Sequence, residues 1–135
     1  MPTTIQGENV GQQLGVSGLL GRALSVNLNS VADTSIPVVA AKYIVRRVVV
    51  ANPSVDLTAS LVQVGLHTEA AGAGTVIVTI AAVLATGLTA EVDAKDLTVA
   101  LAGRSLTFAA LFFRVGVAHG SAATADVYIF GDVLP

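Results

Sequence analysis

The two histidines, His67 and His119, are the side chains of this chain best suited to proton transfer near neutral pH. Each follows an apolar run and precedes a loop of small residues. A catalytic role would require one of them to meet an acid and a nucleophile in a single cleft. The sequence supplies no such set, so we interpret both as surface histidines and predict that the protein is not an enzyme.

Other catalytic and ligand motifs are also missing. The acidic group Glu91, Asp93 and Asp96 lacks the oxygen ligands and the glycine of a calcium loop. Ser17 lies in "GVSGL", which does not have the glycine spacing of a nucleophile elbow. There is no phosphate-binding glycine motif, and the absence of cysteine excludes disulfides, thiolate chemistry and cysteine-based zinc sites. We therefore predict no catalytic residue, no cofactor and no metal.

The stretch "KYIVRRVVVANP", residues 42–53, sets two adjacent arginines inside a run of strand-forming residues. Neighbouring side chains of a strand point to opposite faces, so Arg46 or Arg47 should lie on the side that a sandwich buries. A buried guanidinium must be paired or reach a subunit boundary. The candidate partners are Asp56, Asp126 and Asp132. The candidate interface residues are Arg46, Arg47, Tyr43, Phe113 and Tyr128. For the three aromatics the alternative is packing in the core or on a sheet face, and core packing is the default role of Phe113.

Short strands with turn signals between them predict an all-β fold, either a sandwich or a small barrel. The clearest strand begins at Arg22, where Leu24, Val26 and Leu28 fall on one face. "VADTSIPV" resembles a turn, and residues 84–96 suggest a short helix. Further strands are expected at residues 40–52, 61–67, 75–83, 97–101, 106–118 and 126–131, with 61–67 and 75–83 forming a hairpin.

Two features indicate that this domain contacts other subunits. Residues 106–118 are apolar on both faces of the expected strand, although the outward face of a sandwich is normally polar. Residues 1–21 contain repeated glycines and one charge before Arg22, which predicts an extended arm that becomes ordered against a partner. We expect an arm at 1–21, a β-sandwich domain at 22–135, and a homo-oligomer.

Composition limits the partners. The chain has 135 residues, 53% hydrophobic and 12% charged, with a net charge of −2. Its seven basic residues are scattered, which argues against nucleic-acid binding. Residues 70–90 are uncharged, but glycines and threonines favour a hairpin over a membrane-spanning helix, so we expect no membrane. The N-terminus resembles no secretory signal, and we expect synthesis in a cytoplasm.

The order "DTSIPV", "AKYIVRRVVVANPSVDLT", "HTEAAGAG" and "GSAATADVYIFGDVLP" resembles a family of small tailed-phage proteins that decorate or cement the capsid. The resemblance covers residues 33–135 and implies a jelly-roll-like β-sandwich of about eight strands. It also implies a homo-oligomer, commonly a trimer, bound to the major capsid protein on the capsid surface of the virion. No catalytic residues carry over. The alternative hypothesis is a phage tail, fibre or receptor-binding module.

Overall fold

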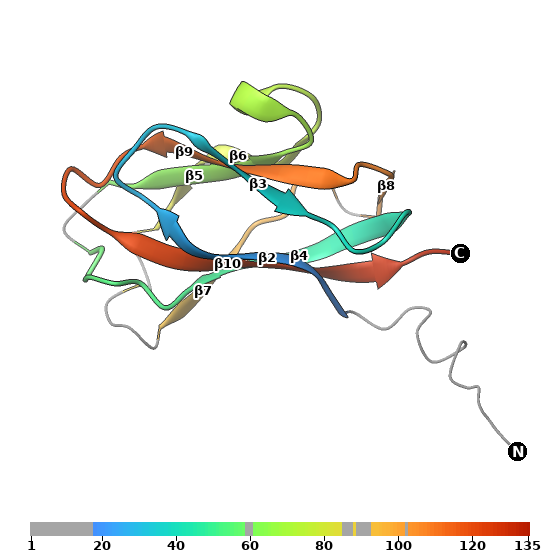
Figure 1. Cartoon of the computed structure of the whole chain (residues 1–135), viewed down its shortest axis with the longest axis horizontal. Coiled ribbons are helices and arrows are strands. Elements are labelled where there is room, and N and C mark those ends of the chain that lie inside the picture. Colours follow the sequence, from blue (N-terminus) through green and yellow to red (C-terminus); the bar gives the residue numbers. More distant parts are fainter. Residues whose placement is uncertain (1–17, 59–60, 85–87, 89–92, 102) are drawn as a thin grey trace, which may run out of the picture.

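In the computed structural model, residues 18–58, 61–84, 88, 93–101 and 103–135 can be described. They form nine β-strands and one 3-10 turn, with no α-helix (Figure 1). The elements are β2 (Gly18–Asn27), β3 (Asp33–Pro37), β4 (Tyr43–Ala51), β5 (Gln63–His67), η1 (Ala70–Gly72), β6 (Val76–Val83), β7 (Ala94–Leu97), β8 (Ser105–Leu106), β9 (Ala110–Val117) and β10 (Thr124–Val133).

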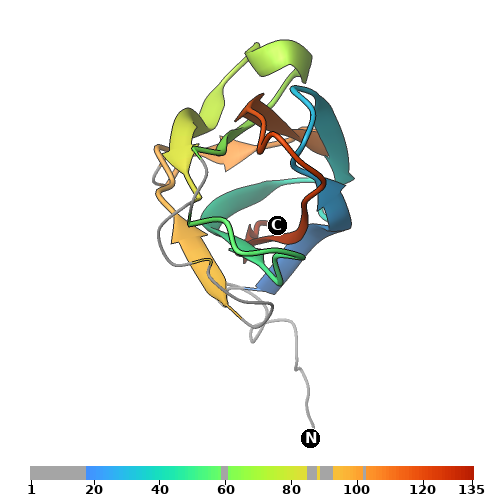
Figure 2. The ribbon, with the colours of Figure 1, turned by 90° about the vertical axis from the view of Figure 1, so that its left-hand side faces the viewer.

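The strands form two antiparallel sheets that stack face to face, which confirms the predicted all-β sandwich (Figures 1 and 2). One sheet has the order β2-β10-β4-β7, with the short β8 also pairing with β4, and the other has the order β3-β9-β5-β6. The pairing is nested along the chain: β2 pairs with β10, β3 with β9, β4 with β7, and β5 with β6. β2 and β10, the first and last strands of the described residues, therefore lie side by side.

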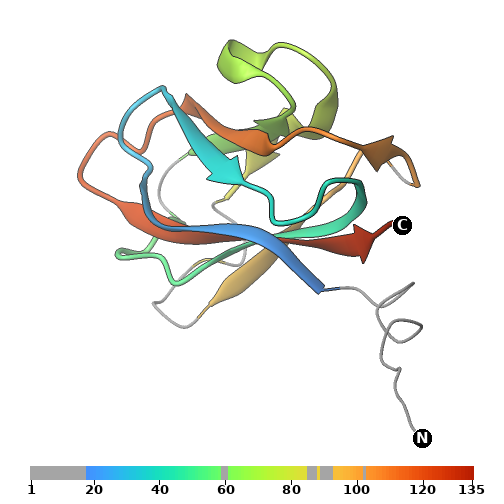
Figure 3. The same cartoon turned by 45° about the vertical axis from the view of Figure 1, so that its right-hand side comes forward.

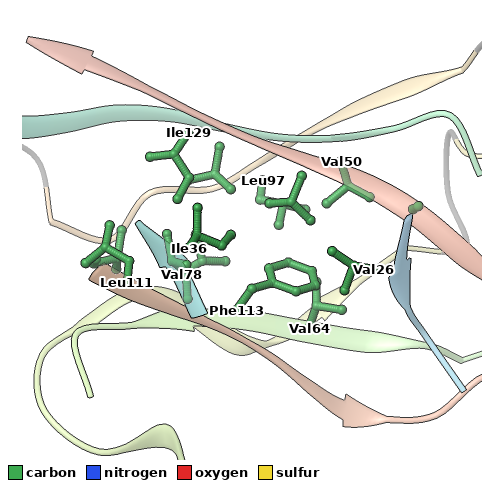
Figure 4. Close-up of a cluster of buried hydrophobic side chains, with 14 of the residues drawn as sticks. Val26, Ile36, Val50, Val64, Val78, Leu97, Leu111, Phe113 and Ile129 are labelled. Carbon is green, nitrogen blue, oxygen red and sulfur yellow. The ribbon is translucent and has the colours of Figure 1, made fainter. Parts of the chain in front are cut away.

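The core fills the space between the sheets with aliphatic side chains, one phenylalanine and one tyrosine. Figure 4 shows a cluster of these buried side chains. β9 shows the alternation that builds it, because Leu111, Phe113 and Val115 are buried while the intervening residues are partly exposed. Burying a side chain of this size contributes about 1.5–3 kcal/mol. The residues labelled in Figure 4 are Val26, Ile36, Val50, Val64, Val78, Leu97, Leu111, Phe113 and Ile129.

Several predicted elements match the structure, and the hairpin is the clearest of them. β5 and β6 pair as antiparallel neighbours, and β4 and β10 lie within or around the ranges expected for them. Five predictions were wrong in part. The expected strand at residues 106–118 is divided: Leu106 belongs to β8, residues 107–109 lie outside any strand, and residues 110–117 form β9. Residues 33–37, expected to be part of a turn, form β3. Residues 94–97 form β7, although residues 94–96 were expected to end a helix and residue 97 to begin a strand. Residues 18–21 of the expected arm begin β2, whereas residues 1–17 lie outside the described residues.

β2 also corrects the expected alternation. Val26 and Leu28 are buried as predicted, but Leu24 is 54% exposed. A β-bulge explains the difference. Between the pairs Ala23–Val127 and Val26–Ala125, β2 has two residues, Leu24 and Ser25, whereas β10 has only Asp126.

The described part of the chain contains no helix with the length and apolar content needed to cross a membrane.

Candidate interaction surfaces

The two arginines of β4 both reach solvent because a β-bulge interrupts this strand. Arg47 lies opposite Phe130 of β10, and the next pair joins Val45 to Gly131. Arg46 is therefore an extra residue on the β4 side of the ladder. The extra residue shifts the inside–outside alternation by one position, so both arginines are exposed. The prediction that one arginine lies on the buried side was wrong.

Each arginine pairs with a carboxylate from a neighbouring strand. Arg46 Nε lies 2.8 Å from Asp132 Oδ2, and Arg47 Nε lies 2.6 Å from Asp96 Oδ1. The hydrogen bond from Arg47 to Asp96, together with the negative charge of Asp96, raises the pKa of Arg47 above its usual value. Asp132 was a predicted partner, whereas Asp96 was expected only as part of an acidic cluster. These contacts hold both guanidinium groups against the sheet without burying them.

The other two predicted arginine partners have different contacts. Asp126 accepts hydrogen bonds from the Ser25 backbone N–H at 2.8 Å and from Asn52 Nδ2 at 2.9 Å. Both donor residues have left-handed backbones, with φ of 53° at Ser25 and 52° at Asn52. Asp56 accepts from the backbone N–H and the hydroxyl of Thr58, and these bonds lower its pKa. Asp126 is thus placed to stabilise irregular backbone on both sides of β10.

An aromatic pair extends the surface formed by the arginines. The Arg47 guanidinium carbon lies 5.8 Å from the ring centroid of Phe130, within the range of a cation–π interaction. The rings of Phe130 and Tyr128 are stacked, with centroids 6.5 Å apart. Arg22, on the neighbouring β2, lies opposite Tyr128. We call this surface, formed by Arg22, Arg46, Arg47, Tyr128 and Phe130, the arginine–aromatic face.

The remaining two predicted interface residues lie in the core. Tyr43 and Phe113 are both fully buried, so neither can contact a partner from this position. The Tyr43 hydroxyl donates a hydrogen bond of 2.7 Å to the Phe108 carbonyl, and burial raises the pKa of Tyr43 to about 12. These two assignments are therefore corrected: large aromatic side chains on inward positions fill the sandwich instead of covering its surface.

A groove of about 510 Å³ lies at the start of β2, and no sequence pattern predicted it. Leu20 is buried, and its carbonyl accepts a hydrogen bond of 2.9 Å from the backbone N–H of Val39. Val39 is 81% exposed and Leu19 is 45% exposed. The groove combines two segments that were expected to be an arm and a turn, so periodicity could not reveal it. Its lining residues are Leu19, Leu20, Gly21, Arg22, Pro37 and Val39.

His67 is the most unusual polar side chain of the other sheet. It is only 4% exposed, although its position pairs with Phe112 on the outward side of β9. Its Nδ1 is buried and has no hydrogen-bond partner among the described residues, a state that costs about 1–3 kcal/mol. Burial lowers the pKa of His67, with a raising influence from Asp33 and a further lowering one from Arg114. The interpretation of His67 as a surface histidine was wrong.

Nothing in the described ranges assembles these residues into a catalytic or metal site. His119 Nδ1 lies 3.1 Å from the Ser121 hydroxyl, two residues along the same loop. No group of three or more His, Cys, Asp or Glu side chains able to hold a metal ion occurs in the ranges that the structure describes. Glu91 and Ser17 lie outside those ranges.

Comparison with known proteins assigns no family. No family model, no curated protein sequence and no solved structure matches this chain.

Proposed function

We propose that this protein is a virion structural protein, a capsid decoration or cement subunit that binds the outer surface of a tailed-phage capsid and stabilises the shell. The arginine–aromatic face carries the proposal. Arginine and tyrosine are enriched among the residues that dominate binding energy at protein interfaces. Here the guanidinium of Arg47 is held in place by Asp96 and Phe130, so little side-chain entropy is lost when a partner binds.

The topology supports the same proposal. Among the described strands, the first (β2) pairs with the last (β10), and the pairs β3–β9, β4–β7 and β5–β6 lie within this outer pair along the chain. Rolling one long antiparallel hairpin into two sheets produces this nested pairing. We therefore propose that the sandwich is a jelly roll. Double-sheet jelly rolls recur in viral capsid domains, although a fold does not by itself fix a function.

We further propose that the protein acts as a homo-oligomer, with a trimer favoured, and that its partner on the virion is the major capsid protein. The low charge content of 12% and the exposed Leu19 and Val39 support a surface that other subunits cover. Many weak contacts repeated over a shell give high avidity, so each single contact can be modest. In this proposal the protein is made in the host cytoplasm and resides on the capsid surface without catalytic activity.

A receptor-binding role in a phage tail or fibre is the second candidate. It is favoured by the fact that lectin domains also use jelly rolls. In that case the arginine–aromatic face would contact a host surface instead of the capsid. The two functions therefore predict different partners for the same side chains.

The test is cosedimentation of the purified protein with empty capsids that lack it, from the phage that encodes it. The double substitution Arg47→Ala and Phe130→Ala should weaken capsid binding by at least about tenfold. Arg104→Ala is the matched control, because it removes an exposed arginine from the turn before β8. Capsid binding that the double variant leaves unchanged would contradict the role of the face.

Two further measurements separate the parts of the proposal. Binding to intact host cells without binding to capsids would favour the receptor-binding role. Light scattering on the purified protein reports the oligomeric state, and a strict monomer at all concentrations would contradict the homo-oligomer without deciding the capsid role.

A further inference from the structure

Residues 68–75 form a strap on the outer side of the sheet β3-β9-β5-β6, with η1 at its top (Figure 3). The base of the strap is closed by two hydrogen bonds between its ends. The Thr75 backbone N–H donates to Thr68 Oγ1 at 2.8 Å, and the Thr68 N–H donates to the Thr75 carbonyl at 3.1 Å. The two ends of the strap are thus held together by hydrogen bonds of their own.

Among the described residues, the Asp33 carboxylate links the strap to the sheet. Asp33 Oδ2 accepts a hydrogen bond of 2.6 Å from the backbone N–H of Ala71, near the top of the strap. The other oxygen, Oδ1, lies 3.2 Å from Arg114 Nη1 of β9. The Asp33 and Arg114 side chains are both partly buried, with 18% and 25% of their surface exposed, so water screens their charges less than it would on an open surface. The Asp33 carboxylate therefore joins three elements: β3, β9 and the strap.

The closed strap has an unfavourable backbone. Ala71 has φ of 60°, in the left-handed region that residues with a Cβ rarely occupy, and Gly72 and Gly74 have φ of 75° and 73°. Glycine tolerates this conformation, but alanine does not favour it. The contact between Ala71 and Asp33 compensates for that cost, so the strap should relax once the contact is lost.

His67 immediately precedes the strap and is buried where β5 meets β9. The charged groups that act on its ring are Asp33 from β3 and Arg114 from β9. Glu69, the acidic residue of the strap, is exposed and lies against Gly74. The β6 residue paired with His67 is Val76, and no residue of β6 is titratable.

We propose that the strap is an acid-sensitive clasp, which is released when protonation of His67 disrupts the contact between Ala71 and Asp33. A protonated His67 places a second positive charge beside Arg114 in a site with little water. It is stabilised only if the Asp33 carboxylate turns toward it or if the strap opens to admit water. Both responses remove the acceptor of the Ala71 N–H.

The direction of the pH dependence follows from the environment of the ring. Because burial lowers the pKa of His67 in the closed form, the closed strap binds a proton less readily than the open one. Closure is therefore fully favoured above the ordinary histidine pKa of about 6.5 and weakens as the pH falls below it. This device is independent of the proposed capsid role, because it lies on the sheet opposite to the arginine–aromatic face.

The test uses the full-length protein and residue-resolved hydrogen exchange by NMR between pH 8 and pH 4.5. In the wild type, the protection factor of the Ala71 amide, corrected for intrinsic exchange, should begin to fall as the pH drops below about 6.5 and should level off once the His67 ring of the closed form has titrated. If opening of the strap raises the His67 pKa by one unit, the protection factor of Ala71 should fall by up to about tenfold, and each further unit should multiply that fall by up to about ten. His67→Gln, which cannot take up the proton, should show a flat profile, and His119→Gln should behave as the wild type.

Two results would overturn the proposal. One is a wild-type protection factor for Ala71 that stays constant from pH 8 through the titration of the His67 ring, a measurement that needs no variant. The other is a pH-dependent loss of protection that persists unchanged in His67→Gln.

Discussion

Replacing Gly131 by alanine should severely destabilise the protein, because the bulge that exposes both arginines leaves no room for a side chain there. A Cβ at Gly131 would overlap the carbonyl oxygen of Ile44 in the neighbouring β4 and would lie 2.7 Å from Leu20 Cδ1. The leucine end could rotate away. The Ile44 carbonyl belongs to the backbone of a central strand and cannot move without breaking the ladder.

The magnitude follows from the kind of atom that must move. Overpacking a core by extra carbons costs typically about 1–3 kcal/mol, and a clash with backbone belongs at the upper end of that range. For a chain of this size, a loss of about 3 kcal/mol lowers the melting temperature by roughly 10 °C. Thermal and urea denaturation, followed by circular dichroism, measure both quantities.

Gly18 supplies the matched control for this substitution. It pairs directly with Gly131 across β2 and β10, yet a Cβ at Gly18 would meet nothing within 4 Å. Gly18→Ala should therefore leave the stability within about 0.5 kcal/mol of the wild type, as for most surface substitutions. If Gly131→Ala is as mild as Gly18→Ala, the bulge at Arg46 does not exist as described.

Two further outcomes are expected. Asp126→Ala should lower the free energy of unfolding in urea by about 1–3 kcal/mol, because the hydrogen bonds from Ser25 and Asn52 lose their acceptor; an unchanged midpoint would mean that the carboxylate does not stabilise these left-handed residues. The pKa of Tyr43 is raised from 10.0 to about 12, so the folded state retains the proton longer than the unfolded state, and stability should decline as pH rises from 10 toward 12. Tyr43→Phe should lack the part of this decline that Tyr43 causes, and identical pH profiles for the two proteins would contradict the burial of the hydroxyl.

The sequence predicted the fold where alternation is regular and failed where the backbone departs from it. β9 buries every second residue, and it was found within the expected strand at residues 106–118. The hairpin of β5 and β6 was found from the small-residue loop between two apolar runs, although register shifts interrupt its pairing. The bulges at Leu24 and Arg46 each shift the inside–outside alternation of the residues that follow. No residue type in either stretch indicates that an extra residue is present. β3 was missed because Pro37, a turn signal, ends an edge strand, where proline is tolerated.

The candidate surfaces were less predictable than the fold because they depend on pairs of distant segments. Tyr43 and Phe113 were expected at an interface, since composition alone cannot distinguish an aromatic that fills a core from one that covers a surface. His67 was expected on the surface because it ends a strand beside a small-residue loop. It is buried where β5 pairs with β9, which brings it beside Phe112 from a distant part of the sequence.

The arginine–aromatic face is better explained by binding than by folding. Exposed ion pairs such as those of Arg46 and Arg47 typically add little to stability, because water screens them and ordering the side chains costs entropy. The bulge that brings both arginines to the same side interrupts a central ladder and requires glycine at position 131. A regular strand would avoid that interruption. Local departures of this kind occur most often at functional sites, which is why we assign the proposed capsid contact to this face.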